Sequence, residues 1–134
     1  MSEGFDEQSK IDLINYRLDR AEQTLDEAKL LASSSYYNAS VNRLYYACFY
    51  ATSALLLRNN ILANTHAGVK KMLGLHFISK GVLPIELGKT FNTLFEKRHA
   101  NDYDDFVYCD QETYNELYPK ALNFVQEIKS YINP

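Results

Sequence analysis

The segment 98–103 (RHANDY) carries the residue types best suited to chemistry in this 134-residue chain. A guanidinium is always charged and offers a rigid fork of donors that suits a phosphate or a carboxylate. Arg98 continues the apolar spacing of its expected helix, so it should point inward, where a cation needs a partner. Asp102 is the nearest candidate partner, and Tyr103 could add a hydroxyl. The segment predicts either an anion-binding site or a local Arg98–Asp102 pair at a helix end, and ion pairs are the commoner arrangement.

The histidines give weaker signals. His66 falls in the first turn of an expected helix, where it could act as a general base or a phosphate donor near neutral pH. It could equally take part in the hydrogen bonding of the helix start, which is the commoner role. His76 is interpreted as a semi-buried structural residue. His99 should face away from Arg98 on the same helix and be exposed.

Acidic residues gather after this segment. Six carboxylates occur between Arg98 and Lys120 with no intervening Lys or Arg: Asp102, Asp104, Asp105, Asp110, Glu112 and Glu116. Clustered carboxylates can hold a hard metal ion, but the calcium-loop spacing with its required Gly is absent. We therefore interpret the run as a solvated acidic loop and expect no metal. A phosphate-cradling Gly-rich loop, a nucleophile elbow and an HExxH motif are also missing from the sequence, so no cofactor is implied.

Composition narrows the class of protein. The net charge of −3 lacks the strongly basic footprint of a general nucleic-acid binder, and any RNA contact should use cations outside the acidic run. These cations are Arg43, Arg58, Lys70, Lys71 and Lys97. Cys48 and Cys109 show no paired spacing, so both are expected to be free thiols in a reducing cytoplasm. The acidic, polar start (MSEGFDEQSK) argues against a signal peptide, and a cytoplasmic location is expected.

The segment 36–58 should form the central helix that positions the candidate site. Fourteen uncharged residues follow Arg43, too few for a membrane span, which needs about 20. One face of this helix is apolar: Val41, Leu44, Cys48, Ala51 and Leu55. A second face is apolar in body and polar at the tip: Asn42, Tyr46, Tyr50 and Ser53. A helix that is apolar nearly all round must be covered nearly all round, so the tyrosine face should meet a partner subunit or a site.

The remaining segments predict four more helices around it. After a flexible lead at 1–8, the first should run from an N-cap at Ser9 to about Ala32, with Arg17 and its charged neighbours in solvent. The third should lie between Thr65 and Gly81, the fourth should start at Pro84, and 100–110 should form a loop. The fifth should open at Asp110, with a kink or restart at Pro119. The expected fold is therefore all-α, an antiparallel bundle of about five helices in a single domain spanning 1–134.

Three segments together resemble the HEPN domain family of prokaryotic toxin–antitoxin and defence systems. Residues 42–49 (NRLYYACF) are similar to the family's tyrosine-rich RAYYAxF helix. Residues 65–69 (THAGV) and 77–81 (FISKG) are similar to its THxGV and FVKxG segments. The segment 98–103 is similar to the RxxxDY signature of a compact stand-alone branch. Each motif is loose alone, but the order and spacing of all three are fairly specific.

The resemblance implies an all-α bundle that is commonly a homodimer and is often encoded beside a minimal nucleotidyltransferase. Active members are metal-independent ribonucleases with an R-x(4–6)-H motif, whose arginine and histidine from two subunits line a shared cleft. The arginine carries over as Arg98, with His99 as its polar neighbour. Tyr103, Asp104 and Asp105 occupy the positions allowed for the histidine, which argues against RNA cleavage by the usual mechanism.

Three hypotheses follow. The first is a HEPN-type component that binds a nucleotide, RNA or a nucleotidyltransferase partner at a cleft centred on Arg98. Its candidate ligand-binding residues are Asn42, Arg43, Tyr46, Arg98 and His99. The second is an endoribonuclease toxin with an altered site, whose candidate catalytic residues are Arg98, Asp102, Tyr103 and His66. The third is a non-catalytic interaction subunit in which an Arg98–Asp102 pair only holds the loop.

Overall fold

The computed structural model of the chain describes residues 6–103 and 108–134, and for 99–103 the description extends to the backbone alone. Its elements are α1 (Glu7–Ser33), α2 (Tyr37–Arg58), α3 (His66–Leu73), the π-helical turn η1 (Gly74–Ile78), α4 (Ile85–Tyr103) and α5 (Gln111–Ile132). Neither described range contains a strand. The all-α bundle expected from the sequence is therefore confirmed.

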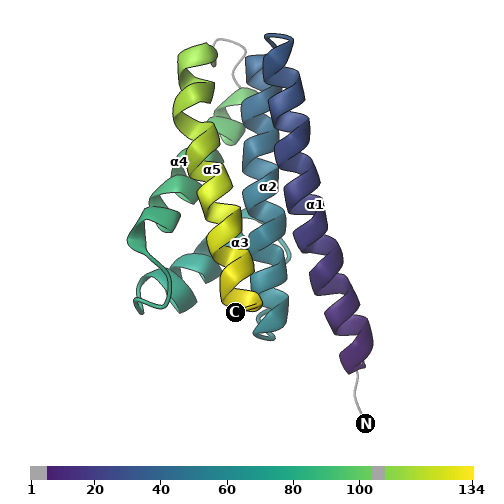
Figure 1. The fold of residues 1–134 in the computed structure, drawn as a ribbon. Coiled ribbons are helices and arrows are strands. Elements are labelled where there is room, and N and C mark those ends of the chain that lie inside the picture. Colours follow the sequence, from purple (N-terminus) through teal and green to yellow (C-terminus); the bar gives the residue numbers. More distant parts are fainter. Residues whose placement is uncertain (1–5, 104–107) are drawn as a thin grey trace.

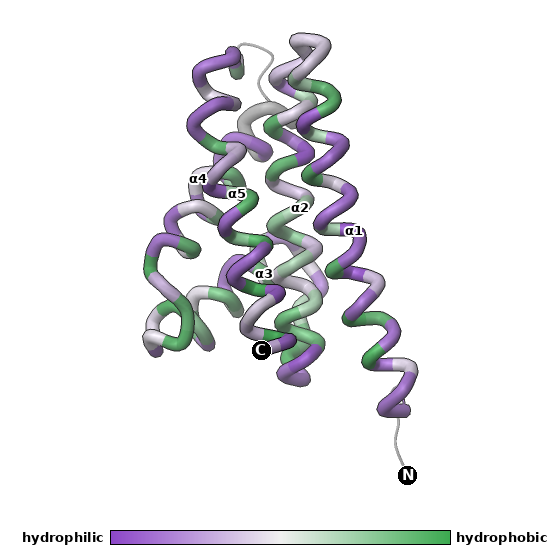
Figure 2. The backbone as a smooth tube through the Cα atoms, in the orientation of Figure 1, coloured by the Kyte–Doolittle hydropathy of each residue, from purple (hydrophilic) through white to green (hydrophobic). Residues whose placement is uncertain are grey.

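Helix α2 is the centre of the bundle, and it packs against α1, α3, α4 and α5. Helices α1 and α4 run in one direction while α2 and α5 run in the other (Figure 1). Eleven of the residues of α2 are buried, because its apolar positions are spread round most of its circumference. Figure 2 shows this as green and pale segments along α2, whereas strongly hydrophilic segments recur along α1. In the part of the chain that the structure describes, no helix is long and apolar enough to cross a membrane.

Polar groups inside this helix are satisfied locally. The Ser40 hydroxyl donates to the carbonyl of Ala28 on α1 at 2.6 Å, and the Thr52 hydroxyl donates to the Cys48 carbonyl at 2.8 Å. Buried hydroxyls without such partners would be costly, so these bonds let a tight α1–α2 contact include small polar residues.

Helix α1 has the predicted apolar stripe but a different start. Ile14, Leu18 and Ala21 are buried along it, as expected. The N-cap is Asp6 rather than Ser9, because the Asp6 carboxylate accepts the Ser9 N–H at 2.7 Å. The expected flexible lead at 1–8 is therefore too long: Glu7 and Gln8 are helical, and 1–5 lie outside the described residues.

The third helical segment starts and stops where the sequence predicts. The Thr65 side chain caps α3 by accepting the Gly68 N–H at 2.9 Å. Gly81 has a φ of +70°, the left-handed conformation that glycine adopts at low cost. Between them the helix changes to a π-helical turn at Gly74–Ile78, which the periodicity did not predict.

Helices α4 and α5 confirm one prediction, contradict a second and narrow a third. Asp110 caps α5 by accepting the Thr113 N–H at 2.9 Å, as its position indicates. The predicted loop at 100–110 is wrong at its start, because α4 continues to Tyr103. Residues 104–107 of that predicted loop lie outside the described residues. Helix α5 is continuous across Pro119, so of the expected kink or restart the restart does not occur within 111–132, and the kink stays a prediction.

Candidate functional site

The candidate site is organised around Tyr45, whose side chain is completely buried on α2. Its ring makes edge contacts with Tyr46 at a centroid distance of 5.2 Å and with Phe91 of α4 at 5.6 Å. Its hydroxyl lies 2.8 Å from Nδ1 of His66, the first residue of α3. One buried phenol therefore joins the central helix, α4 and the start of α3.

His66 is held by packing as well as by this bond. The Thr65 cap fixes the start of α3, and the imidazole stacks on Phe49 with a centroid distance of 4.5 Å. Burial raises the pKa of Tyr45, against the opposing effect of the nearby Arg98 charge, so the phenol stays protonated at neutral pH. A protonated phenol can donate to Nδ1, and this favours the imidazole tautomer that carries its hydrogen on Nε2.

Arg98 continues the inward face of α4. Leu87, Phe91 and Leu94 precede it on that face and are buried, while Arg98 is half-buried. Its Nε donates to the Tyr46 hydroxyl at 3.3 Å. The guanidinium carbon lies 5.6 Å from the Tyr45 ring centroid and 5.8 Å from that of Tyr46, within the range of a cation–π contact. The expectation that Arg98 lies on the inward side of α4 is confirmed, and its guanidinium contacts two tyrosines of α2.

We define the Arg98 cluster as Tyr45, Tyr46, Phe49, His66 and Arg98. Other cations flank it. Arg43 also lies over the Tyr46 ring, with its guanidinium carbon 4.8 Å from the ring centroid. Arg43 also pairs with Glu27 of α1 at 3.7 Å, so part of its charge is offset. Lys70 of α3 places its ammonium 4.8 Å from the ring centroid of Phe95 on α4.

The structure brings together four of the candidate residues, Arg43, Tyr46, His66 and Arg98. Asn42 lies beside them, where its side-chain oxygen accepts from Nη2 of Arg43 at 3.4 Å. The backbones of His99, Asp102 and Tyr103 belong to the end of α4. Their side chains lie outside the described residues, and so does the predicted pair between Arg98 and Asp102.

Sequence reasoning missed Tyr45 and Phe49 as members of the site. Tyr45 was assigned to neither face of α2, yet it is the residue that links His66 to the environment of Arg98. The available signal was the spacing of Tyr45 and Phe49, four residues apart on one helix and therefore on the same side of it. What the sequence does not contain is the direction from which α3 approaches them.

The arrangement combines the two kinds of contact that a nucleotide needs. Guanidinium donors can bind phosphate oxygens, and aromatic faces can stack on a base. The imidazole of His66 adds a further polar ring to the same cluster. In the described part of the chain, no group of three or more His, Cys, Asp or Glu side chains is placed to hold a metal ion.

Comparisons with known proteins identify the family. The model of the HEPN domain matches residues 14–131. A "UPF0332 protein" of Thermotoga maritima is 38% identical over 120 residues, which cover 90% of this chain and 91% of that protein. Two proteins of Methanocaldococcus jannaschii are also similar. "Putative toxin MJ0142" is 33% identical over 86% of this chain and 78% of its own length. "Putative toxin MJ0605" is 36% identical over 81% of both chains. This chain therefore belongs to the HEPN domain family.

Proposed function

We propose that the protein is a toxin-type HEPN component that acts in the cytoplasm and binds a nucleotide or an RNA strand at the Arg98 cluster. Two observations support the toxin class: the family match over most of the chain, and the names of the two M. jannaschii relatives. The binding role is supported by the geometry of the cluster rather than by those names. RNA and free nucleotides share the relevant chemistry, a phosphate next to an aromatic base.

The contact between Arg98 and the tyrosine pair carries the proposal. A half-buried guanidinium that hydrogen-bonds Tyr46 and lies over two tyrosine rings is fixed in position before any ligand arrives. A pre-positioned fork loses little side-chain entropy when it binds a phosphate. Arg43 approaches the same Tyr46 ring from α2, so two cations lie on one aromatic platform.

The proposal includes a homodimer, in which two Arg98 clusters share one cleft, and a minimal nucleotidyltransferase as a cognate partner. Both rest on the family resemblance. Light scattering at micromolar concentration tests the first, because a shared cleft requires twice the monomer mass. Co-purification with an adjacent nucleotidyltransferase tests the second.

A second candidate function, a metal-independent endoribonuclease, is favoured by one observation. His66 is in the cluster, with Nδ1 held 2.8 Å from the Tyr45 hydroxyl. It is thereby placed to supply the acid–base group that the motif positions after Arg98 lack. In this alternative His66 moves the proton and Arg98 stabilises the charged phosphate.

One binding and cleavage experiment separates these functions. Fluorescence anisotropy with a short labelled single-stranded RNA should show salt-sensitive binding that Arg98→Met weakens about tenfold. Lys89→Met, at an exposed position of the same helix α4, is the matched control and should bind normally. RNA that stays intact supports the binding function, whereas cleavage lost in both Arg98→Met and His66→Ala supports the nuclease. If Arg98→Met lowers the melting temperature but leaves RNA binding unchanged, the cluster is only structural and the proposal fails.

A further inference from the structure

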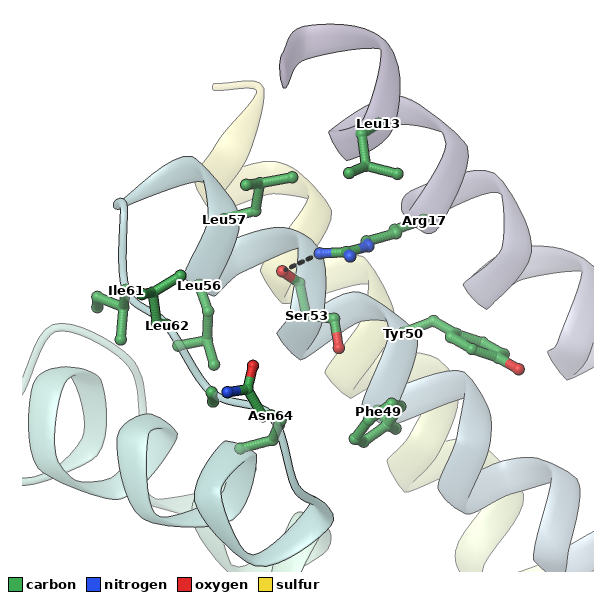
Figure 3. A pocket seen from close by; sticks show the side chains of 12 residues that line it. Leu13, Arg17, Phe49, Tyr50, Ser53, Leu56, Leu57, Ile61, Leu62 and Asn64 are labelled. Carbon is green, nitrogen blue, oxygen red and sulfur yellow. Dashed lines mark hydrogen bonds between the residues drawn. The ribbon is translucent and has the colours of Figure 1, made fainter. Parts of the chain in front are cut away.

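A cavity separate from the Arg98 cluster opens between α1, the second half of α2 and the loop that follows α2. Its volume is about 430 Å³, within the range of small-molecule sites. Figure 3 shows its wall, to which α1 contributes Leu13 and Arg17. The rest of the wall comes from residues 49–57 of α2, from the loop at 61–64 and from Val69 of α3.

Among the described residues that line this wall, Arg17 is the one that carries a charge. The sequence pattern placed it in solvent, but it is half-buried and reaches across to α2 (Figure 3). Its Nη1 donates to the Ser53 carbonyl at 3.4 Å, which is long for such a bond. No described carboxylate forms an ion pair with Arg17, whereas Arg20, one turn further along α1, lies 3.5 Å from Glu27. Burial lowers the pKa of Arg17, as expected for a cation without a counter-ion.

The remainder of the wall is mostly apolar. Leu56 and Val69 are buried beneath it, while Leu62 leaves 87% of its surface exposed at the rim. The uncharged residues of the wall that carry polar groups are Tyr50, Ser53 and Asn64. An apolar hollow with a few polar groups in its wall is typical of a site for a small organic molecule.

We propose that this cavity binds a small-molecule monocarboxylate with an aliphatic body. The carboxylate pairs with the Arg17 fork in the bidentate geometry that guanidinium favours, and the aliphatic part lies among the leucines of α2 and the loop. A single guanidinium matches a single negative charge better than a phosphate dianion. The apolar wall offers little to the sugar of a nucleotide, so this site differs in ligand class from the Arg98 cluster.

The proposal does not depend on RNA binding. Phe49 is the one residue that the cavity shares with the Arg98 cluster, since it stacks on His66 and also lines the cavity. Either proposal can therefore fail while the other holds.

Calorimetric titration with decanoate below its micellar concentration tests the site. We expect binding at one equivalent per chain, weakened roughly tenfold or more in Arg17→Met, because that variant keeps the apolar stem and removes the charge. Arg20→Met, on the same helix but outside the wall, is the matched control and should bind as the wild type does. Ala63→Leu, which keeps Arg17 and fills the cavity, should also lose binding.

Three results would overturn the proposal. Equal binding of decanoate and the uncharged 1-decanol would show that Arg17 contributes nothing. Normal decanoate binding by Arg17→Met would show the same. A fall in oligomeric mass in Ala63→Leu, without any decanoate binding by the wild type, would show that a second copy of the chain occupies this face. Thermal melting of each variant, measured without ligand, ensures that lost binding is not lost folding.

Discussion

Replacing Tyr45 with Phe tests the bond that organises the candidate site. The substitution removes one hydroxyl from a completely buried side chain and keeps the ring that contacts Tyr46 and Phe91. The net loss is one hydrogen bond, about 1 kcal/mol. At about 2.1 cal/mol/K per residue, 134 residues give an unfolding entropy of about 0.28 kcal/mol/K. The expected fall in melting temperature is therefore about 4 °C.

Thermal unfolding followed by circular dichroism measures this fall. Tyr16→Phe is the matched control, because Tyr16 is 61% exposed and its hydroxyl is in solvent. Nitrogen NMR of the imidazole gives a second readout. In the wild type His66 should be the Nε2–H tautomer, whereas in Tyr45→Phe both tautomers should be populated. A Tyr45→Phe protein as stable as Tyr16→Phe, with an unchanged tautomer, would refute the account of His66.

Three further predictions concern the scaffold. Gly81→Ala should destabilise the protein by about 1–2 kcal/mol, because φ is +70° at this position. Gly74→Ala should stabilise the protein by about 0.5–1 kcal/mol, because φ is −63° there and the space around it is open. Urea titration measures both changes in the free energy of unfolding. The N–H of Thr113 lowers the pKa of Asp110 below its usual 3.8, so the stability it contributes is present above that pH and is lost as pH falls through the folded-state value. Asp110→Asn should flatten the stability profile below about pH 4. Cys48 and Cys109 are both buried, and burial raises the pKa of Cys48, so Ellman's reagent should label both only after unfolding in urea; labelling of the native protein would contradict this burial.

Most of the fold could be predicted from the helical spacing of apolar residues in the sequence. The stripes of α1, α4 and α5 could be predicted because each buries one face, and Gly81 takes the left-handed conformation expected at the end of its helix. The π-helical turn could not be predicted, since Gly74–Ile78 continues the same apolar spacing. Cys109 was expected in a polar loop but is buried, because its N–H is fixed by the side chain of Asn38 at 2.6 Å.

The candidate site was only partly predictable. The inward direction of Arg98 follows from spacing on a single helix. The contact between His66 and Tyr45 depends on how α3 packs against α2, and no local sequence pattern specifies that packing. Arg17 shows the same limit: periodicity places it on the solvent side of α1, but its side chain reaches across to the Ser53 carbonyl of α2. Sequence patterns therefore did not predict the contacts between elements that lie far apart in the chain.

Photocrosslinking tests most directly where RNA binds. A short RNA containing 4-thiouridine would be irradiated with the wild-type protein, and the crosslinked peptide would be mapped by mass spectrometry. We expect crosslinks at Tyr46 or Phe49, lost in Arg98→Met and kept in Lys89→Met. Crosslinks confined to the outer surface of α4 and α5, around Lys89 and Lys120, would contradict this expectation.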